Sequence, residues 1–404
     1  MLMGSEPLNP DRESHEFSLV LGGPLYQLWR RTKLVRSPME LLHRRIIAFI
    51  VVTWLPLAVL SIMAGTFASG VKVPFLYDLT TLHFVIVLPI LIAAELVVHR
   101  RMREIVEEFL ERELIAPADL PQFKSLIHRA IRLRNSVVVE VLLLVLSLTG
   151  GNWAWRNYAS LHASTWYATA VDGASQLNAA GYWLAFVSLS IVRFIVFRWY
   201  FRLFNWYLFL WRVSRLKLRL NPLHPDRAGG LGFLEHTVTA FAPVLMAQSC
   251  LLAATIGNRI LHSGDLLPDF KLEILGVVVS LMVLVLLPLT FFAIQMVEAK
   301  FVASREYGGL ASRYANNFRQ KWLVEGKAPD ESLLGTGDIQ SLADLANSFA
   351  VVHEMRPVPF DRHLIVRLAS LIALPLLPLV LTMIPFEELL DRLLQLFLFQ
   401  GAEH

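Results

Sequence analysis

Long, uninterrupted apolar stretches constrain the fold of this chain more than any other feature. About 20 helical residues cross a bilayer core, and several stretches reach that length without a charged residue. Lipid cannot satisfy a bare backbone, so spans are helices or closed barrels, and barrel strands would alternate apolar with polar residues. The sequence therefore predicts an all-α polytopic membrane protein with about seven transmembrane helices, at residues 46–66, 79–98, 136–150, 180–202, 237–257, 274–297 and 364–384.

Composition agrees with the membrane class and narrows the chemistry. Apolar residues make up 55% of the 404 residues and charged residues 17%, whereas soluble domains carry about 25% charged residues. The single cysteine, Cys250, excludes an intramolecular disulfide and a cysteine-based zinc site. The first apolar stretch begins near Ile46, too late for a cleaved signal peptide, so we expect the first span to act as an uncleaved signal.

Basic residues are sorted by loop, and this sorting sets the expected orientation. Thirty of the 37 Lys and Arg fall in the alternating segments 1–45, 99–135, 198–235 and 299–363. Basic loops stay in the cytoplasm, which predicts a cytoplasmic N-terminus and an outer C-terminus. Contact with anionic membrane lipids accounts for the net charge of +4, and no nucleic-acid partner is predicted.

The spans divide the chain into two similar halves. Pro56 and Pro243 each lie within the first span of a half, and Pro89 and Pro288 each lie nine residues before a valine that ends the second. This pattern predicts a 3+1+3 parallel pseudo-repeat, which is one transporter design, although Leu/Val/Pro patterns also match by accident. The expected divisions are a cytoplasmic N-terminal segment (1–45), a first three-helix half (46–150) with a cytoplasmic helical linker (99–135), an aromatic outer loop with a connector helix and a basic loop (151–236), a second half (237–384) with a cytoplasmic subdomain (299–363), and an outer amphipathic tail (385–404).

Charged residues within the spans are the first candidates for function, because a charge at membrane depth is costly. Arg193 lies near the middle of the fourth span, so we expect it to face the bundle interior and to pair with Glu140, or else with Glu95. Glu140 and Arg367 lie at similar depth in the third span of each half, and they are predicted to meet across the pseudo-axis. Two interpretations are open for this set, a transport path or gate and a structural ion pair that fixes helix register: Arg193, Glu140, Glu95 and Arg367.

The stretch NPLHPDRAGGLGFL, residues 221–234, is crowded with turn formers and ionisable groups. Its prolines end the preceding helix and its glycines permit positive φ or close backbone approach, so a sharp corner where the chain enters the membrane explains every residue. The same residues are candidates for a hinge or a ligand-binding loop: His224, Asp226, Arg227, Gly229, Gly230 and Gly232.

Three further interpretations of this loop compete with the corner. Glycine-rich backbone at a helix N-terminus can hold an anion, although neither a GxGxxG nor a P-loop pattern is present. His224, Asp226 and His236 could bind a metal, although no fixed-spacing motif supports a metal site. The HPDR tetrapeptide after a basic helix resembles the J-domain of Hsp70 co-chaperones, over residues 212–227 alone.

The whole loop, HPDRAGGLGFL, is similar to one carried by uncharacterised bacterial multi-pass inner-membrane proteins. GTGDIQSLADLANSF, residues 335–349, is less clearly similar to the same proteins, and its apolar spacing predicts an amphipathic helix. The resemblance implies a bacterial inner membrane and supplies no activity.

Polar side chains are scarce within the spans, whereas a carrier for a sugar or amino acid needs several that converge. The sequence therefore favours a channel or transporter for a small ion or solute, gated from the cytoplasmic side. The alternatives are a membrane-embedded sensor or scaffold that recruits a cytoplasmic protein partner, and a lipid-directed enzyme. No catalytic residue, metal or cofactor is predicted, and a homo-oligomer is expected. The helices that carry the path are predicted to break at Pro56, Pro89, Pro243 and Pro288.

Overall fold

The computed structural model describes residues 17–20, 22, 23, 27, 42–149, 164–171, 174–324 and 336–383. Helices dominate these residues, which confirms the predicted all-α class. The α-helices are α3 (Leu42–Thr53), α4 (Leu55–Met63), α5 (Leu88–Glu111), α6 (Leu120–Arg134), α7 (Val137–Leu148), α9 (Ala179–Trp183), α10 (Leu189–Val213), α11 (Glu235–Ser263), α12 (Lys271–Leu286), α13 (Ala293–Arg319), α14 (Gly337–His353), α15 (Arg362–Ala373) and α16 (Leu377–Val380). The short 3-10 and π segments are η1 (Phe75–Tyr77), η2 (Leu79–Thr81), η3 (His83–Val87), η4 (Pro117–Asp119), η6 (Leu184–Ser188), η7 (Gly232–Leu234), η8 (Leu267–Phe270), η9 (Leu287–Phe292), η10 (Gln320–Val324), η11 (Leu374–Leu376) and η12 (Leu381–Met383). The strands β1 (Ala168–Val171) and β2 (Ala174–Leu177) pair as an antiparallel hairpin.

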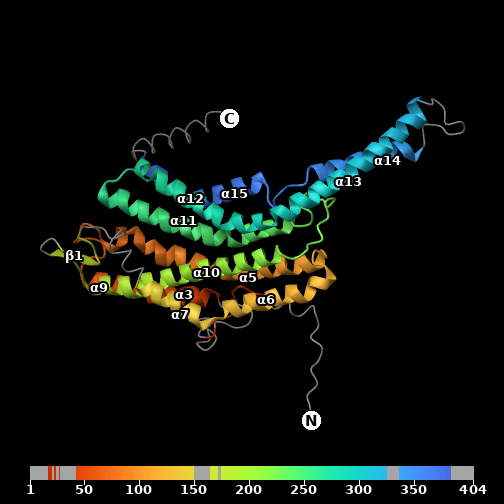
Figure 1. Ribbon diagram of the computed structural model, residues 1–404. Coiled ribbons are helices and arrows are strands. Elements are labelled where there is room, and N and C mark those ends of the chain that lie inside the picture. The colour runs from red at the N-terminus through yellow and green to blue at the C-terminus, as the bar shows by residue number, and fades with distance from the viewer. Residues whose placement is uncertain are drawn as a thin grey trace, which may run out of the picture.

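The long helices lie side by side and run back and forth between two ends of an elongated bundle (Figure 1). One end carries the arginine-rich connections, residues 112–119, 214–234 and 354–361, and is called the basic end. The other end carries residues 65–78, 164–178 and 264–270 and is called the far end. Every described polar group can therefore be placed by its distance along a helix from one of these two ends.

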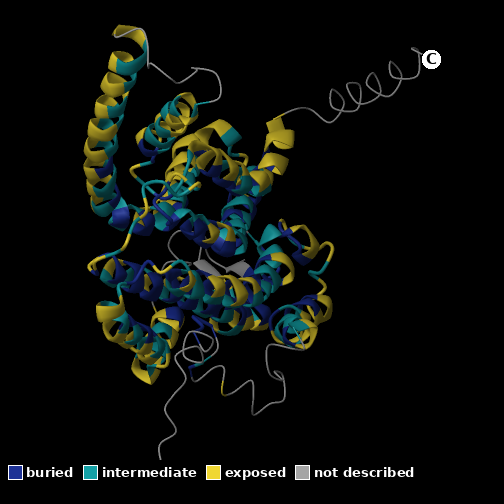
Figure 2. Ribbon diagram, turned by 90° about the vertical axis from the view of Figure 1, so that its right-hand side faces the viewer, coloured by how far each residue is buried: buried dark blue, intermediate teal, exposed yellow. Residues whose placement is uncertain are grey.

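Six helical segments are long and apolar enough to cross a membrane: Leu42–Met63, Leu79–Glu111, Ala179–Val213, Gly232–Ser263, Leu267–Val324 and Arg362–Met383. Large apolar side chains remain exposed on their outer faces, such as Ile62 (60%) and Leu275 (59%). Figure 2 shows these exposed faces around a buried interior. So extensive an apolar surface is stable against lipid and not against water, and the chain is therefore an integral, multi-pass membrane protein.

The segment expected to form the third span is shorter than the others. The apolar helix α7 has 12 residues, because a turn at Asn135 separates it from α6. Ser136 caps the new helix by accepting a hydrogen bond from the Val139 N–H at 3.5 Å. The helix runs alongside α10 (Figure 1), and its outer face is apolar, with Val138 68% exposed. Six helices of membrane length are thus found in the described residues, and a seventh crossing stays a prediction.

Three of the four prolines expected to break spans do so. Pro56 lies in the first turn of α4, where the chain resumes after α3, and Pro89 lies in the first turn of α5, after the π turn η3. Pro288 lies in η9 between α12 and α13. At a first turn the missing proline N–H is no loss. Pro243 lies inside the continuous helix α11, so the predicted break there is wrong.

The two predicted halves meet through α5 and α11, which form the central contact of the bundle. Their third helices have different neighbours, because α7 packs against α10 whereas α15 packs against α11 and α12. The helices are matched in order but not in packing, and the parallel pseudo-repeat stays a prediction.

Part of the N-terminal segment enters the bundle at the basic end. Phe17 is fully buried, and its ring centroid lies 5.5 Å from that of Phe209 and 6.3 Å from that of Trp206, both on α10. Residues 17–20 are therefore part of the core. The predicted outer tail, residues 385–404, lies outside the described residues.

At the far end the aromatic outer loop is partly internal. Trp166 is fully buried and does not lie in an interfacial belt. Its indole Nε1 donates a hydrogen bond to Asp78 at 2.8 Å, and the same carboxylate accepts hydrogen bonds from Asn258 Nδ2 of α11 at 2.7 Å and from the Thr80 N–H at 2.8 Å. This network ties the loop that follows α4 to the far-end half of α11.

Helices α13 and α14 form a hairpin that projects from the basic end (Figure 1). The Asp338 carboxylate at the start of α14 accepts hydrogen bonds from Lys321 Nζ at 2.9 Å and Trp322 Nε1 at 3.0 Å. The hydroxyl of Tyr314 donates to the Asp338 carbonyl at 3.1 Å. The predicted helix at 335–349 is thus confirmed in type, and it packs on α13.

Gly181 of α9 provides a test of packing at the far end. A Cβ built at Gly181 would overlap the backbone carbonyl oxygen of Tyr167. A backbone atom cannot swing aside, so Gly181→Ala is expected to lower the free energy of unfolding by about 1–3 kcal/mol. Gly276 of α12 is the matched control, since a Cβ there meets nothing within 4 Å, and Gly276→Ala should be neutral or stabilising by up to about 1 kcal/mol. Thermal unfolding in detergent compares the two variants, and equal midpoints would contradict the expectation.

Candidate functional site

Five charged side chains from four helices form a charge cluster near the middle of the long helices: Arg45, Glu95, Glu140, Arg198 and Arg202. Glu95 is its centre, with Oε2 2.7 Å from Arg45 Nη1 and Oε1 2.7 Å from Arg202 Nη2. Arg198 lies between the two carboxylates, with Nη1 3.9 Å from Glu95 Oε1 and Nε 3.3 Å from Glu140 Oε1. The cluster thus joins α3, α5, α7 and α10 through one connected set of ion pairs.

Helical spacing and one tryptophan position the cluster. Arg198 and Arg202 lie four residues apart on α10 and therefore share a face. The Arg202 guanidinium also lies 4.6 Å from the ring centroid of Trp199, a cation–π contact. Trp199 is held in turn by a hydrogen bond from its Nε1 to the Leu91 carbonyl of α5, at 3.1 Å. The same turn of α5 that receives this bond leads to Glu95, so the two helices are locked where the charges meet.

The cluster is almost completely removed from solvent. Arg45 is 1% exposed, Glu95 2% and Arg202 5%. Each buried charge carries a desolvation penalty of several kcal/mol, which close pairing offsets. Among these five residues, three guanidinium groups face two carboxylates. Such a set can fix helix register, or it can form a gate whose ion pairs exchange.

A small cavity adjoins the cluster. Its volume of about 20 Å³ is room for a single water molecule. Glu140, Arg198 and Arg202 contribute to its wall, together with Leu19 and Val20 from the N-terminal segment. The cavity therefore lies between the charge cluster and the segment that enters from the basic end.

Hydrogen bonds fasten that N-terminal segment over the cavity. The Arg134 Nη1 donates to the Ser18 carbonyl at 2.6 Å, and the Ser18 hydroxyl lies 2.9 Å from His99 Nδ1. The Gly23 N–H donates to Asn135 Oδ1 at 3.1 Å. Together with the buried ring of Phe17, these bonds make the segment a plug beside the α6–α7 turn.

A row of polar side chains, here called the polar row, runs from the level of the cluster toward the far end: Tyr200 and Arg193 of α10, Gln248 and Ser249 of α11, and His83 of η3. The Tyr200 hydroxyl donates to Gln248 Oε1 at 3.3 Å. His83 lies beside the backbone of Leu251 and within electrostatic reach of Arg193. Helices from both predicted halves therefore contribute polar groups to this row, of which Ser249 is buried and Tyr200 is exposed.

Three atoms of the polar row are shielded from solvent and find no hydrogen-bond partner among the described residues: His83 Nε2, Gln248 Nε2 and Ser249 Oγ. An unsatisfied buried polar group is destabilising by about 1–3 kcal/mol, and proteins normally satisfy such groups with protein atoms or ordered water. These atoms therefore mark positions at which water or a small polar solute would be favourably bound.

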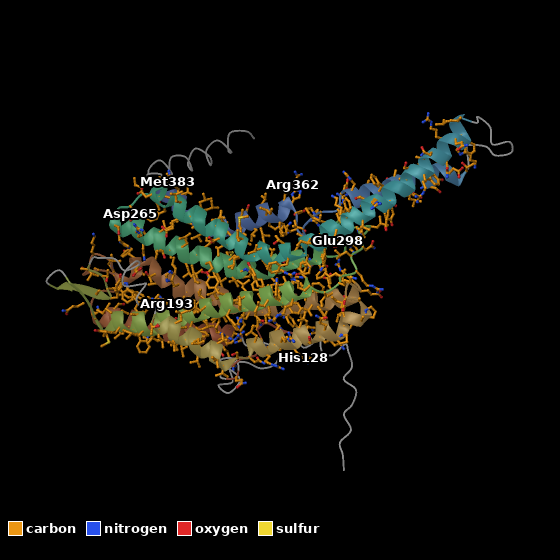
Figure 3. The ribbon with its side chains drawn as sticks, in the orientation of Figure 1. His128, Arg193, Asp265, Glu298, Arg362 and Met383 are labelled. Carbon is orange, nitrogen blue, oxygen red and sulfur yellow. The ribbon has the colours of Figure 1, made fainter. Side chains whose placement is uncertain are left out.

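The carboxylates expected to pair with Arg193 are bound by other arginines. Arg198 contacts Glu140 and Arg202 contacts Glu95, because both carboxylates lie at the depth of Arg198 and Arg202 and not at that of Arg193. Arg193 lies closer to the far end of α10 (Figure 3), about 7.5 Å along the helix from Arg198 at 1.5 Å per residue. It belongs to the polar row and not to the cluster.

Glu140 and Arg367 do not meet across a pseudo-axis. Their helices, α7 and α15, lie on opposite sides of the bundle (Figure 1), and Arg367 is exposed. The prediction assumed that both third helices pack at one axis, and their different neighbours remove that premise. Arg367 therefore has no place in the cluster or in the polar row.

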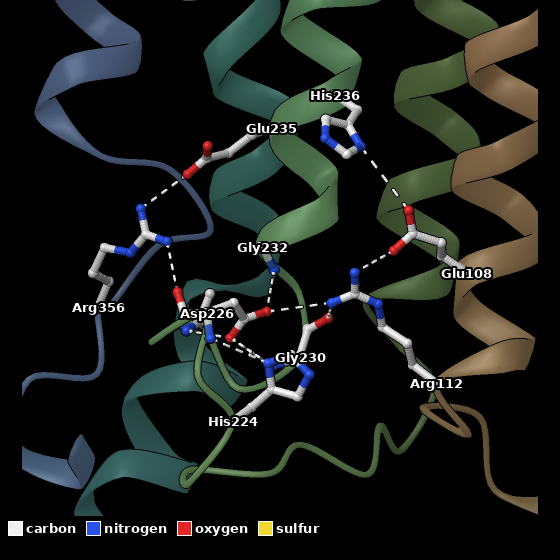
Figure 4. Close-up of polar contacts among 10 residues, drawn as sticks. Glu108, Arg112, His224, Asp226, Gly230, Gly232, Glu235, His236 and Arg356 are labelled. Atoms are coloured by element: carbon white, nitrogen blue, oxygen red, sulfur yellow. Dashed lines mark hydrogen bonds and ion pairs between the residues drawn. The ribbon is translucent and has the colours of Figure 1, made fainter.

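The loop between α10 and α11 forms a compact loop junction organised by Asp226 (Figure 4). Asp226 Oδ1 accepts hydrogen bonds from the backbone N–H groups of Ala228 at 2.8 Å and Gly230 at 3.2 Å, and Oδ2 accepts one from Gly232 at 2.9 Å. His224 Nδ1 lies 2.9 Å from Asp226 Oδ1. The loop thus folds its backbone around its own carboxylate.

The glycines of the loop are required by this folding. Gly229 and Gly230 have φ of +67° and +96°, values that side chains rarely adopt. A Cβ at Gly232 would lie 2.9 Å from Oδ2 of Asp226, so its N–H can reach the carboxylate only without a side chain. Arg227 also has a positive φ of +52°. The predicted corner is confirmed as a turn, and its geometry is set by one acidic side chain.

Two arginines outside the loop attach it to its neighbours (Figure 4). Arg112, just past the end of α5, donates to the Gly230 carbonyl at 3.1 Å and lies 3.5 Å from Asp226 Oδ2. Arg356, between α14 and α15, donates to Glu235 Oε1 at 2.9 Å and to the Asp226 carbonyl at 2.8 Å. The junction therefore ties together the basic ends of α5, α11 and the α14–α15 connection.

The charge state of Asp226 is part of this structure. Burial raises the pKa of the Asp226 carboxyl, but hydrogen bonds from the Ala228, Gly232 and Gly230 N–H groups and the nearby His224 lower it more. The net result is a pKa below the usual value for aspartate. The ionised carboxylate is the form that accepts these bonds, so the loop is held by a charge at neutral pH.

This arrangement decides between the interpretations of the loop. The N–H groups that an external anion would need already donate to Asp226, which contradicts a phosphate site there. Within the described part of the chain, no three His, Cys, Asp or Glu side chains converge to hold a metal ion. His236 lies 4.0 Å from Glu108, away from the His224–Asp226 contact. The hinge interpretation remains a prediction.

Several residues of the charge cluster and of the loop junction were not predicted from the sequence. Arg45 and Arg202 were counted with the cytoplasmic basic residues that set orientation, and Arg112 and Arg356 lie in connections. The i, i+4 spacing of Arg198 and Arg202 was the available signal, because it places two cations on one face of an apolar helix. No local signal identifies Arg112 or Arg356, whose partners are distant in sequence.

Comparison of the chain with known proteins finds no matching family model, no matching curated protein and no matching solved structure.

Proposed function

We propose that this membrane protein passes a small ion or solute across a bacterial inner membrane, and that the charge cluster closes the path on the cytoplasmic side. The observation that carries the proposal is the group of shielded polar atoms of His83, Gln248 and Ser249, which have no hydrogen-bond partner among the described residues and lie in the same bundle as the charge cluster and its cavity. Basic loops remain in the cytoplasm, so the arginine-rich basic end would face inward.

The width of the path suits a small species. The cavity beside the cluster holds about one water molecule, and the polar row offers single hydroxyl, amide and imidazole groups instead of a converging set. Such groups can replace the hydration of an ion or small solute in steps. A narrow conduit is therefore favoured over a carrier with a dedicated binding site.

The charge cluster and the N-terminal plug would act together as the gate. Arg198 is shared by Glu95 and Glu140, so a small rotation of α10 can exchange one ion pair for another without leaving a bare charge. Opening also requires residues 17–20 to leave the cavity wall. The loop junction would set the resting position, because it fixes the basic ends of α5 and α11.

Flux measurements in reconstituted vesicles test this proposal. Dye-loaded vesicles of anionic and zwitterionic lipid would report passage of H⁺, K⁺ and Cl⁻ for the wild type and three variants. Phe17→Ala should raise flux of at least one of these ions about tenfold or more, because it loosens the plug. Arg193→Gln, placed on the Phe17→Ala background, should lower that flux by about tenfold. A tenfold change corresponds to a barrier to passage that is higher by about 1.4 kcal/mol.

Arg259→Gln is the matched control for the arginine change. Arg259 pairs with Asp265 at 3.0 Å at the far end, where its side chain is 48% exposed, so flux should be unchanged. Variants must reach the membrane folded, which is checked by their thermal unfolding. Absence of H⁺, K⁺ and Cl⁻ flux in both the wild type and the folded Phe17→Ala variant would overturn the proposal.

One observation favours a second candidate, a scaffold that recruits a cytoplasmic protein. The α13–α14 hairpin projects from the bundle (Figure 1), and apolar side chains near its tip are exposed, among them Leu323 (72%) and Ile339 (46%). If no flux is found, and a soluble protein binds the hairpin in a manner lost on changing Leu323 and Ile339 to serine, the scaffold replaces the conduit.

A further inference from the structure

An open, cationic groove lies where α6 meets α7 and faces the side of α10. Its volume is about 600 Å³. The six residues that line it are Arg129, Arg132, Leu133, Asn135, Ser136 and Arg212. Half of them are arginines and none is acidic, so the groove has no internal counter-charge.

The three arginines carry charge that the described protein does not neutralise. Arg129 and Arg132 are exposed and Arg212 is half-buried. Within the described ranges none of the three forms an ion pair, in contrast to Arg103, which binds Glu107 one turn away at 2.8 Å. Three like charges around one groove repel each other, so an anion bound there would relieve a repulsion present in the free protein.

The groove lies at the boundary between polar and apolar surface. The exposed helix face that follows it consists of valine and leucine, beginning with Val137, Val138, Val141 and Leu142. Trp211, beside Arg212, is 43% exposed, as is common for tryptophan at the level of lipid headgroups. The arginines therefore lie at headgroup depth, with an acyl-sized apolar surface directly adjoining.

We propose that this groove binds the phosphate of an anionic phospholipid whose acyl chains lie along the exposed face of α7. Guanidinium groups recognise phosphate oxygens through paired N–H donors, and Asn135 and Ser136 add uncharged donors. The groove also opens at the first turn of α7, where the helix dipole favours an anion. The groove shares Ser136 with the cavity at the charge cluster, and Asn135 also binds the N-terminal segment, but its three arginines belong to neither.

The shortness of α7 gives this lipid a structural role. A helix of 12 residues spans about 18 Å at 1.5 Å per residue, well short of a bilayer core of about 30 Å. A lipid phosphate held at the α6–α7 turn fixes the headgroup level there, and its chains cover apolar surface that α7 alone leaves open. Free phosphate shares the headgroup chemistry but supplies none of this cover.

Lipid binding to the full-length protein in zwitterionic nanodiscs tests the proposal. Phosphatidylglycerol would be titrated and its occupancy followed by native mass spectrometry, with phosphatidylcholine and inorganic phosphate as separate arms. The double variant R129Q/R132Q is expected to bind phosphatidylglycerol about 30-fold more weakly, at about 1 kcal/mol for each basic residue near an anionic surface. The matched control R305Q/R313Q, which removes two exposed arginines of α13, should bind it unchanged.

The arms separate a lipid site from a site for any phosphate. Val138→Asn should weaken phosphatidylglycerol binding and leave binding of inorganic phosphate unchanged, because Val138 touches only the acyl chains. The unfolding midpoint of R129Q/R132Q without anionic lipid should equal that of the wild type, since both arginines are exposed and form no ion pair with a described residue. Equal phosphatidylglycerol binding by R129Q/R132Q and R305Q/R313Q overturns the proposal. Inorganic phosphate binding as tightly as the lipid overturns it as well.

Discussion

Replacing Glu95 by glutamine is expected to lower the free energy of unfolding by about 3–5 kcal/mol, the typical effect of removing one partner from a buried ion pair. Glutamine keeps the shape of the side chain but removes the charge that faces Arg45 and Arg202 at 2.7 Å and Arg198 at 3.9 Å. The cluster then holds three cations against the single carboxylate of Glu140. Denaturation in mixed detergent micelles would measure the loss.

Two comparisons separate this effect from a general loss of packing. Glu104→Gln makes the same chemical change on the same helix, where Glu104 pairs with Arg101 at 3.1 Å and both side chains are about half exposed. It should be destabilising by less than about 1 kcal/mol. The double variant E95Q/R202Q restores the original charge balance. Its loss of stability should therefore be smaller than the sum of the losses of the two single variants. Strict additivity would contradict a charge-based account.

Replacing Asp226 by alanine is expected to have the second largest effect, a loss of about 2–4 kcal/mol. The backbone N–H groups of Ala228, Gly230 and Gly232 would lose their acceptor together, and each hydrogen bond to a charged group contributes about 1.5–3 kcal/mol when buried and less when partly wet. The turn at Gly229 would lose the contacts that hold it. Thermal unfolding at neutral pH would measure the change.

The pKa of Asp226 supplies an internal control. Because the pKa of the folded carboxyl is lowered, its contribution is complete above the unfolded value of about 3.9 and is lost as the pH falls through the folded value. The stability difference between wild type and Asp226→Ala should therefore shrink below about pH 4. Glu354→Ala is the matched control, since the Glu354–Arg227 pair at 3.0 Å is more than half exposed on both sides. A difference that persists unchanged in acid would refute the role of the ionised carboxylate.

The architecture could be predicted because it follows from local composition. Apolar stretches of bilayer length become helices irrespective of their neighbours, and the described helices follow the predicted spans. Prolines also predicted the position of a helix break correctly where they lie in the first turn of the next helix, as at Pro56 and Pro89. Pro243 shows the limit of the rule, because adjacent packing can carry a helix past a missing hydrogen bond.

The partners of the charges could not be predicted, because they depend on which helices are neighbours. Arg193 is deepest in its span and was expected to bind Glu140. The carboxylate lies instead at the depth of Arg198, one helical turn and a half closer to the basic end. Arg45 belongs to the cluster because α3 packs beside α5, a contact between segments fifty residues apart. A list of charges by depth therefore indicates candidates but not pairs.

The loop at residues 221–234 could also be predicted only in part. Its turn formers indicated a corner, and positive φ values at Gly229 and Gly230 confirm one. What the sequence alone did not reveal is that Asp226 binds the loop's own backbone, which removes the anion-binding interpretation. The ligands of a backbone nest are apparent only once the turn geometry is known.

The continuous helix α13 makes the projecting hairpin a stiff lever. Its 27 residues extend about 40 Å, and its base follows η9, where the ring centroid of Phe292 lies 6.4 Å from that of Phe109 on α5. A force applied at the tip of the hairpin would thus be transmitted to α5, whose basic end binds the loop junction through Arg112. A force on the α13–α14 hairpin and the position of α5 in the bundle are therefore mechanically coupled.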